Sequence, residues 1–172
     1  MVYGSCLKAI SRFLLCLLIV SPSANGDSGK DALFVTWEGF ETDKCASIWL
    51  IRRFIAPAAE IRFYPRGTQF TEGIAFDTPD AQLRRYHNKS TFETLLERYA
   101  LEDVKLIYLG RIIHDIEVNT WERKVMAETP QVENDMQALI AQEDTQRILE
   151  GCQAYFEQLY QTGIGSAKPV TP

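Results

Sequence analysis

The fold is decided by the stretch D-K-C-A-S-I-W-L-I-R-R-F-I, which covers residues 43–55. It follows an apolar, strand-like run at residues 33–37 and a short turn at residues 38–42. A helix that is apolar on nearly every side is usually buried, so we predict a buried helix here. Asp43 is expected to cap the N-terminus of this helix, because its carboxylate can accept from free backbone amides. Pro57 is expected to stop the helix.

Two further strands are expected after this helix. Residues 60–64 alternate apolar and polar side chains, which is typical of a strand with one buried face. A Pro-Arg-Gly turn follows at residues 65–67, and residues 73–77 are predicted to form a third short strand. Together with residues 33–37, these strands would make a small three-stranded sheet near the N-terminus.

The second half of the chain is predicted to be helical. Ser90 and Glu93 fit a capping box at the start of one helix, and Asp103 is expected to cap the next. Three more helices are expected at residues 121–127, from Thr129, and from near Asp144. The predicted fold class is therefore α+β, with the sheet covered by about five helices and a helix-rich C-terminal half.

Residues 1–26 have the features of a secretory signal peptide. Lys8 and Arg12 supply the positive start, residues 13–20 supply the apolar core, and small residues precede a cleavage site after Gly26. The apolar core is short for a bilayer span, although an uncleaved membrane anchor is the alternative interpretation. We therefore expect a periplasmic or secreted protein with no stable membrane span after cleavage.

The rest of the chain divides into a polar lead-in at residues 27–32, one domain at residues 33–162 and a flexible tail at residues 163–172. The whole chain carries a net charge of −5, and loss of the signal's two basic residues takes this to −7. Proteins that bind duplex nucleic acid usually present a basic face, so nucleic acid is not expected as a partner.

Two of the four cysteines, Cys45 and Cys152, remain after removal of the signal. Both lie on the apolar sides of predicted helices, so two buried free thiols are one interpretation. Export would make a disulfide between them chemically feasible, and this is the alternative. A metal site that uses both cysteines is less favoured, since the chain has no Cys-x-x-Cys spacing.

Four motifs carry a family resemblance. They are D-K-C-A-S-x-W-L-I-x-R-F-I from Asp43, F-D-x-P-x-A from Phe76, T-F-E from Thr91, and I-I-H-D from Ile112. In this order and at these spacings they resemble the chromate-resistance exported protein family. The same domain forms the C-terminal half of ChrB-type chromate-responsive regulators. The resemblance covers roughly residues 33–160 and implies an exported protein that contributes to chromate resistance by binding or sensing an oxyanion, or by assisting its reduction.

A basic loop offers a candidate oxyanion site. Arg84, Arg85, His87 and Lys89 lie just before a predicted helix N-terminus, whose free backbone amides favour negative charge. Arginine adds planar donors that match oxyanions, so a tetrahedral dianion such as chromate or sulfate is the expected ligand. The alternative is an ordinary solvated loop.

Arg53, near the end of the buried helix, is the remaining candidate for anion binding. A charged group in that position needs a partner. If this partner is a carboxylate rather than an anion, Asp77 is one candidate.

A second hypothesis is a metal-dependent enzyme. His114 and Glu117 are one helical turn apart and would share a face. Such a pair can hold a divalent metal ion or pass a proton, with Asp43, Asp77 or His87 completing the ligand set. The alternative is a surface histidine that is hydrogen-bonded to Glu117.

The third hypothesis is a structural or interaction protein, in which these polar side chains serve only as helix caps and ion pairs. The sequence contains no P-loop, dinucleotide-binding fingerprint or Ser-His-Asp signature, so the enzyme classes with strong motifs are unsupported.

Overall fold

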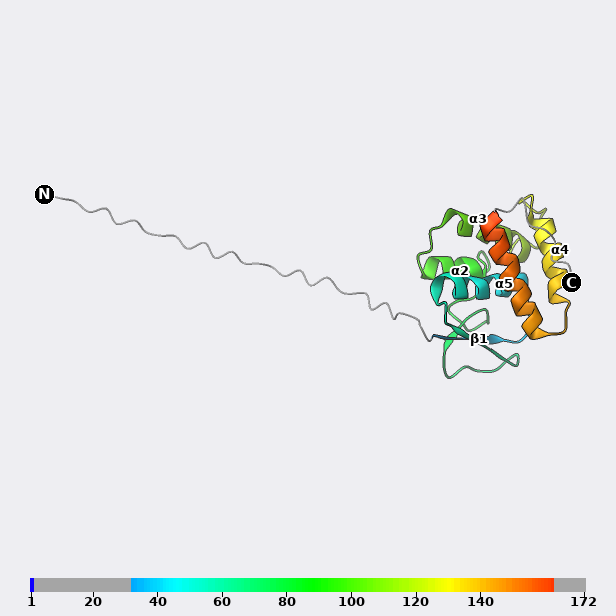
Figure 1. Cartoon of the computed structure of the whole chain (residues 1–172), viewed down its shortest axis with the longest axis horizontal. Helices are drawn as coiled ribbons and strands as arrows, with labels where there is room; N and C mark the ends of the chain where they lie inside the picture. The colour runs from blue at the N-terminus through cyan, green and yellow to red at the C-terminus, as the bar shows by residue number, and fades with distance from the viewer. Residues whose placement is uncertain (2–31, 163–172) are drawn as a thin grey trace.

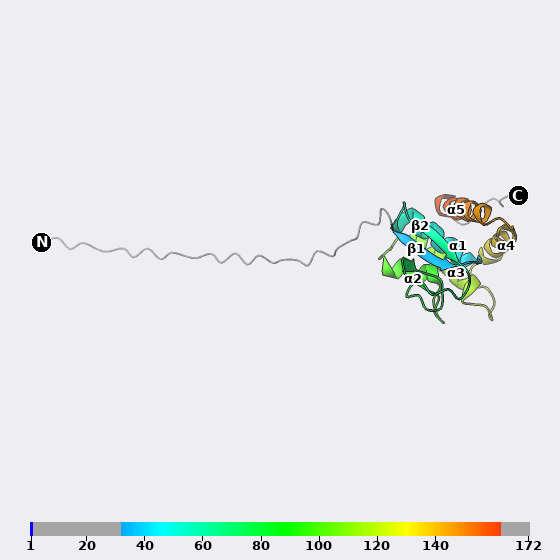
Figure 2. The same ribbon diagram turned by 90° about the horizontal axis from the view of Figure 1, so that it is seen from below.

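The computed structural model describes residue 1 and residues 32–162, and these contain a small parallel sheet. Its strands are β1 (Leu33–Trp37), β2 (Glu60–Tyr64) and β3 (Ile74–Ala75), in the order β2-β1-β3. In the pairing register, Val35 of β1 lies opposite Arg62 of β2 and Ala75 of β3. Figure 2 shows β1 and β2 side by side, in front of the helices in this view. The three predicted strands are confirmed, although the third is shorter than expected.

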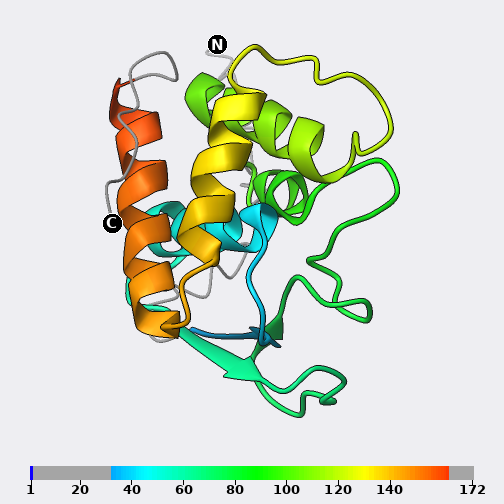
Figure 3. The ribbon, with the colours of Figure 1, turned by 90° about the vertical axis from the view of Figure 1, so that its right-hand side faces the viewer.

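Helix α1 (Thr42–Leu50) forms the centre of the molecule and continues into a π-helical turn at Ile51–Ile55. All nine of its residues are buried, which confirms the prediction from its apolar sequence. It contacts α2, α3, α4 and α5, so the other helices surround it. Figure 3 shows α1 (cyan) behind α4 and α5, with the sheet below.

The four remaining helices are α2 (Thr91–Arg98), α3 (Val104–Glu117), α4 (Thr129–Ile140) and α5 (Thr145–Thr162). Two of the predicted caps are present. The Ser90 side chain accepts from the Glu93 amide while the Glu93 carboxylate accepts from the Ser90 amide, and Asp103 accepts from the Lys105 amide. Figure 1 shows these helices gathered above β1. The fold is α+β, as the sequence predicted.

The short helix predicted at residues 121–127 is wrong, because this segment has no regular structure. The buried carboxylate of Asp115 on α3 holds the segment instead. It accepts from the amides of Val125 (2.8 Å) and Met126 (3.0 Å) and from the Thr129 hydroxyl (2.7 Å). Burial alone would raise the pKa of Asp115, but these hydrogen bonds and one from Asn119 outweigh it and lower the pKa to about 2.

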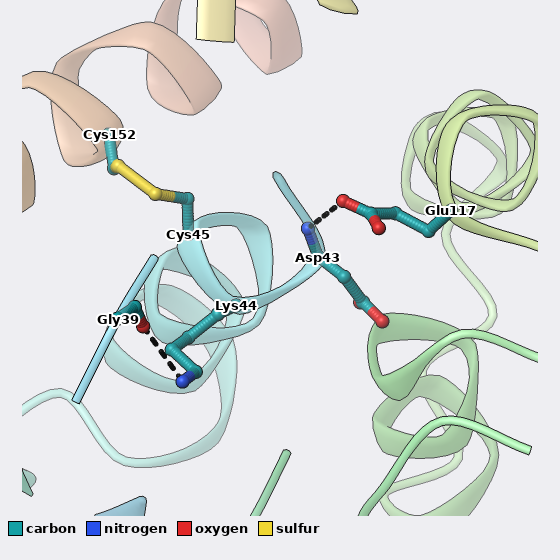
Figure 4. The surroundings of a disulfide bond; sticks show 6 residues. All are labelled: Gly39, Asp43, Lys44, Cys45, Glu117 and Cys152. Carbon is teal, nitrogen blue, oxygen red and sulfur yellow. Dashed lines mark hydrogen bonds between the residues drawn. A yellow bond between two sulfur atoms is a disulfide. The ribbon is translucent and has the colours of Figure 1, made fainter. Parts of the chain in front are cut away.

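A disulfide joins Cys45 of α1 to Cys152 of α5, with the Cα atoms 5.5 Å apart (Figure 4). The expectation of two free thiols is therefore wrong, and the alternative that the sequence left open is the one observed. Both cysteines are buried in the core, which also contains Trp49 and Phe156. Within residues 32–162, no helix is long and apolar enough to cross a membrane. The predicted signal peptide and C-terminal tail lie outside the described residues.

Candidate functional site

Asp43 caps a helix, but not the helix that the sequence indicated. It lies inside the first turn of α1, and Glu41 occupies the N-cap position without a side-chain hydrogen bond to the amides of this helix. The Asp43 carboxylate instead accepts from the amides of Thr91 (2.7 Å) and Phe92 (2.8 Å), which begin α2. Figure 4 shows this carboxylate pointing toward α2 (green) and away from Glu117. The predicted role as a cap of its own helix is wrong, because the next helix brings its free amides to the same buried place.

Lys44 is the second charged residue of the central helix, and its ammonium group is also buried. It donates to the carbonyls of Trp37 and Gly39, both at 2.8 Å, and lies 3.6 Å from the carboxylate of Asp77. Figure 4 shows the contact with Gly39. Burial lowers the pKa of Lys44, and the neighbouring Asp77 opposes this shift. Lys44 therefore ties α1 to the loop after β1 and to the segment after β3.

Arg85 joins three carboxylates. Its Nη2 lies 2.7 Å from Glu41 and 2.9 Å from Glu117, and its Nε lies 3.7 Å from Asp43. Glu117 also accepts from the Asp43 amide at 3.3 Å. Arg85 thus serves as the counter-ion of an acidic cluster that is contributed by α1, α3 and the turn before α1.

This cluster perturbs the ionisation of its members. Burial, followed by repulsion from Asp77, raises the pKa of Asp43 to about 7, while the amides of Thr91 and Phe92 and the charge of Arg85 oppose the rise. Burial likewise raises the pKa of Asp77 and of Glu117. A group of carboxyls with raised pKa values beside a cleft is a recognised mark of a functional site.

The cleft has a volume of about 600 Å³ and opens at the carboxyl ends of the strands. Trp37 and Glu38 line it where β1 ends, Arg66 lies just after β2, and Asp77 comes just after β3. In open parallel sheets, ligands bind beyond the carboxyl ends of the strands, where neighbouring connections diverge. The order β2-β1-β3 creates such a point beside β1.

Four cations line the cleft, and two of them lack a carboxylate partner. Lys44 and Arg85 are occupied as described above. The guanidinium of Arg84 donates to the Ala81 carbonyl at 3.0 Å and lies over the ring of Tyr86. Within the residues that the structure describes, neither Arg84 nor Arg66 has a carboxylate within ion-pair distance. Arg66 was not among the predicted anion-binding residues, although its place in a turn after a predicted strand was a usable signal.

The other predicted anion-binding residues point to different places. Arg53 pairs with Glu157 of α5 at 3.2 Å, so the expected pair with Asp77 is wrong. Lys89 pairs with Glu97 at 2.6 Å. His87 lines a separate pocket beside α3. Of the five residues predicted for oxyanion binding, the structure brings only Arg84 and Arg85 to the cleft.

The predicted metal ligands are not gathered at one point. The Nδ1 of His114 lies 2.9 Å from the carboxylate of Glu93, whereas Glu117 contacts Arg85 and the amide of Asp43. The alternative of a hydrogen bond between His114 and Glu117 is therefore replaced by one to Glu93. In the part of the chain that the structure describes, no group of three or more His, Cys, Asp or Glu side chains is placed to hold a metal ion.

Comparison with known proteins identifies the family of this chain. The family model "ChrB, C-terminal domain" matches residues 34–163, which include all the elements described above except the first residue of β1. The chain belongs to the ChrB C-terminal domain family. The resemblance inferred from the four sequence motifs is thereby confirmed.

A curated relative supports the same family. The chain is 36% identical over 78 residues to Protein ChrB of Cupriavidus metallidurans. The match covers 44% of this chain and 24% of the relative, so this chain corresponds to only part of that protein. No solved structure matches the chain. The family supports a protein related to chromate resistance.

Proposed function

We propose that this ChrB-type domain binds a small tetrahedral oxyanion such as chromate in the cleft at the carboxyl ends of its strands. The observation that carries the proposal is that Arg66 and Arg84 line one cleft and have no carboxylate partner among residues 32–162. A guanidinium presents a planar fork of donors that matches the oxygens of an oxyanion. Binding is the step shared by sensing an oxyanion and by assisting its reduction.

Arg66 and Arg84 are better placed to bind an anion than the other two cations of the cleft, which already have partners. Lys44 is held by two carbonyls and Asp77, and Arg85 by Glu41 and Glu117. An anion that recruited Lys44 would have to break these contacts and leave the buried carboxylate of Asp77 without its cation, which is costly. The Nε of Arg85 has no hydrogen-bond partner within the described residues, but its Nη2 is committed to Glu41 and Glu117. Arg66 and Arg84 can turn to an anion without that cost, so we assign them the binding role and assign Lys44 and Arg85 to support of the cleft.

A calorimetric titration of chromate tests this assignment. The double variant Arg66→Gln/Arg84→Gln should bind chromate about 10- to 100-fold more weakly than the unmodified protein, because it loses charge-assisted hydrogen bonds. Arg53→Gln is the control for a single lost arginine, since Arg53 lies outside the cleft and pairs with Glu157. It should leave the affinity unchanged. Equal affinities in the double variant and the unmodified protein would refute the assignment.

We also propose that the chain is exported. The support comes from the signal-like residues 1–26 and from the disulfide between Cys45 and Cys152. Disulfides form and persist in oxidising compartments such as the periplasm and are rare in the cytosol.

A further inference from the structure

The cleft contains carboxylates as well as arginines, and this affects which anion it can accept. Glu38, Glu41 and Asp77 all line it. Glu38 and Glu41 are exposed, whereas the Asp77 side chain is only 10% exposed. Water screens the first two charges more effectively than the third. Of these three carboxylates, Asp77 therefore repels an oxyanion bound in the cleft most strongly.

Asp77 is held firmly in place. One carboxylate oxygen accepts from the Thr91 hydroxyl at 2.6 Å, and the other lies 3.6 Å from the ammonium of Lys44. Its backbone amide donates to the Leu83 carbonyl at 2.8 Å. The backbone has a φ of 51°, in the left-handed region that aspartate and asparagine tolerate better than most residues. Each carboxylate oxygen can accept more than one hydrogen bond, so Asp77 retains capacity for a ligand.

We propose that Asp77 makes the cleft selective for tetrahedral oxyanions that carry a proton, such as hydrogenchromate and hydrogenphosphate, over sulfate. The proposal rests on the proposed function, because it concerns the same cleft. A protonated oxyanion can donate its O–H to the Asp77 carboxylate while its other oxygens accept from Arg66 and Arg84. Chromate and phosphate take up a proton near neutral pH, whereas sulfate does so only in strong acid. Sulfate would thus place a bare oxygen against a carboxylate.

The charged surroundings determine where the shared proton resides. The groups that act on Asp77 are Lys44 and Asp43 of α1, Glu41 before α1, Arg85 of the basic loop, and Glu117 of α3. Burial raises the pKa of Asp77, whereas the hydrogen bond from Thr91 and the charges of Lys44 and Arg85 oppose this rise. They favour the ionised form of Asp77, which accepts a hydrogen bond but cannot donate one. Sulfate could obtain a hydrogen bond from Asp77 only after that carboxylate had itself taken up a proton against these cations.

The test compares chromate, phosphate and sulfate by calorimetric titration at neutral pH. The unmodified protein should bind chromate and phosphate about 10- to 100-fold more tightly than sulfate, the range expected for one hydrogen bond to a charged group. In Asp77→Asn the amide can donate to a bare oxygen, so the preference should fall to near unity, mainly through tighter sulfate binding. Asparagine also tolerates the left-handed backbone, so the variant should fold.

The control variant is Glu38→Gln, which removes the same charge from an exposed position in the same cleft. It should change the affinities for all three anions by a similar factor and preserve their ratio. Equal affinity of the unmodified protein for chromate and sulfate would overturn the selectivity and leave the proposed anion site standing. An unchanged ratio in Asp77→Asn would also overturn it. Failure to bind any of the three anions would overturn the anion site itself.

Discussion

Asp43 shows how a single buried carboxylate connects separate parts of the sequence. It belongs to the D-K-C-A-S motif, and its carboxylate caps the helix that begins with the T-F-E motif at Thr91. The sequence indicated that Asp43 caps its own helix, and it could not show that the side chain caps α2 instead. Thr91 lies 48 positions away, and contacts at that separation depend on the tertiary fold rather than on local preference.

The raised pKa of Asp43 predicts how stability depends on pH. A carboxyl whose pKa is higher in the folded state binds its proton more tightly there, so stability falls as pH rises from the group's ordinary pKa to about 7. In Asp43→Asn the decrease in the free energy of unfolding over this pH range should be smaller by on the order of 2 kcal/mol, since an amide does not titrate. The measurement is chemical unfolding at a series of pH values.

The matched control for Asp43→Asn is Asp80→Asn, which changes an exposed aspartate near the same cleft. Its stability should follow that of the unmodified protein across the whole pH range. If the unmodified protein instead became more stable between mildly acidic and neutral pH, the burial of an ionisable Asp43 would be contradicted.

At the scale of helices and strands, predictions from local signals agree best with the structure. The Ser90 capping box, the Asp103 cap and the start of α4 at Thr129 are confirmed, because each depends on residues within one helical turn. The expected helix at residues 121–127 fails because Asp115, on the preceding helix, takes up the amides of Val125 and Met126. Local preference is overridden wherever a buried group elsewhere supplies a better hydrogen bond.

The disulfide between α1 and α5 closes a loop with a sequence separation of 107. Replacement of Cys45 and Cys152 together by serine should lower the free energy of unfolding by about 2–5 kcal/mol. Chemical unfolding of the purified variant and the unmodified protein measures this difference. Equal unfolding free energies would contradict the stabilising role of the disulfide.

If export occurs as proposed, the mass of the chain recovered from cells should correspond to the oxidised form beginning at Asp27. A recovered chain that retains Met1 would contradict the proposed export and cleavage.

At the scale of the whole molecule, the site is built by the order of the strands. The sequence predicted three strands and a basic loop, but it did not give the order β2-β1-β3 that places Arg66, Asp77 and Arg84 around one cleft. The same loop sends His87 and Lys89 into other surroundings. Because the basic residues of this loop are close in sequence, they were expected to form one site, and they do not. Arg66, which lies 18 residues before Arg84, was not predicted as part of the site.

The most direct test of the account is to locate chromium in crystals of the protein grown or soaked with chromate, from its anomalous scattering. We predict a peak in the cleft beyond the carboxyl ends of β1 and β3, within contact of the Arg66 and Arg84 guanidinium groups and beside Asp77. A peak confined to the pocket lined by His87 and His114, or to the surface beside Arg53, would contradict it.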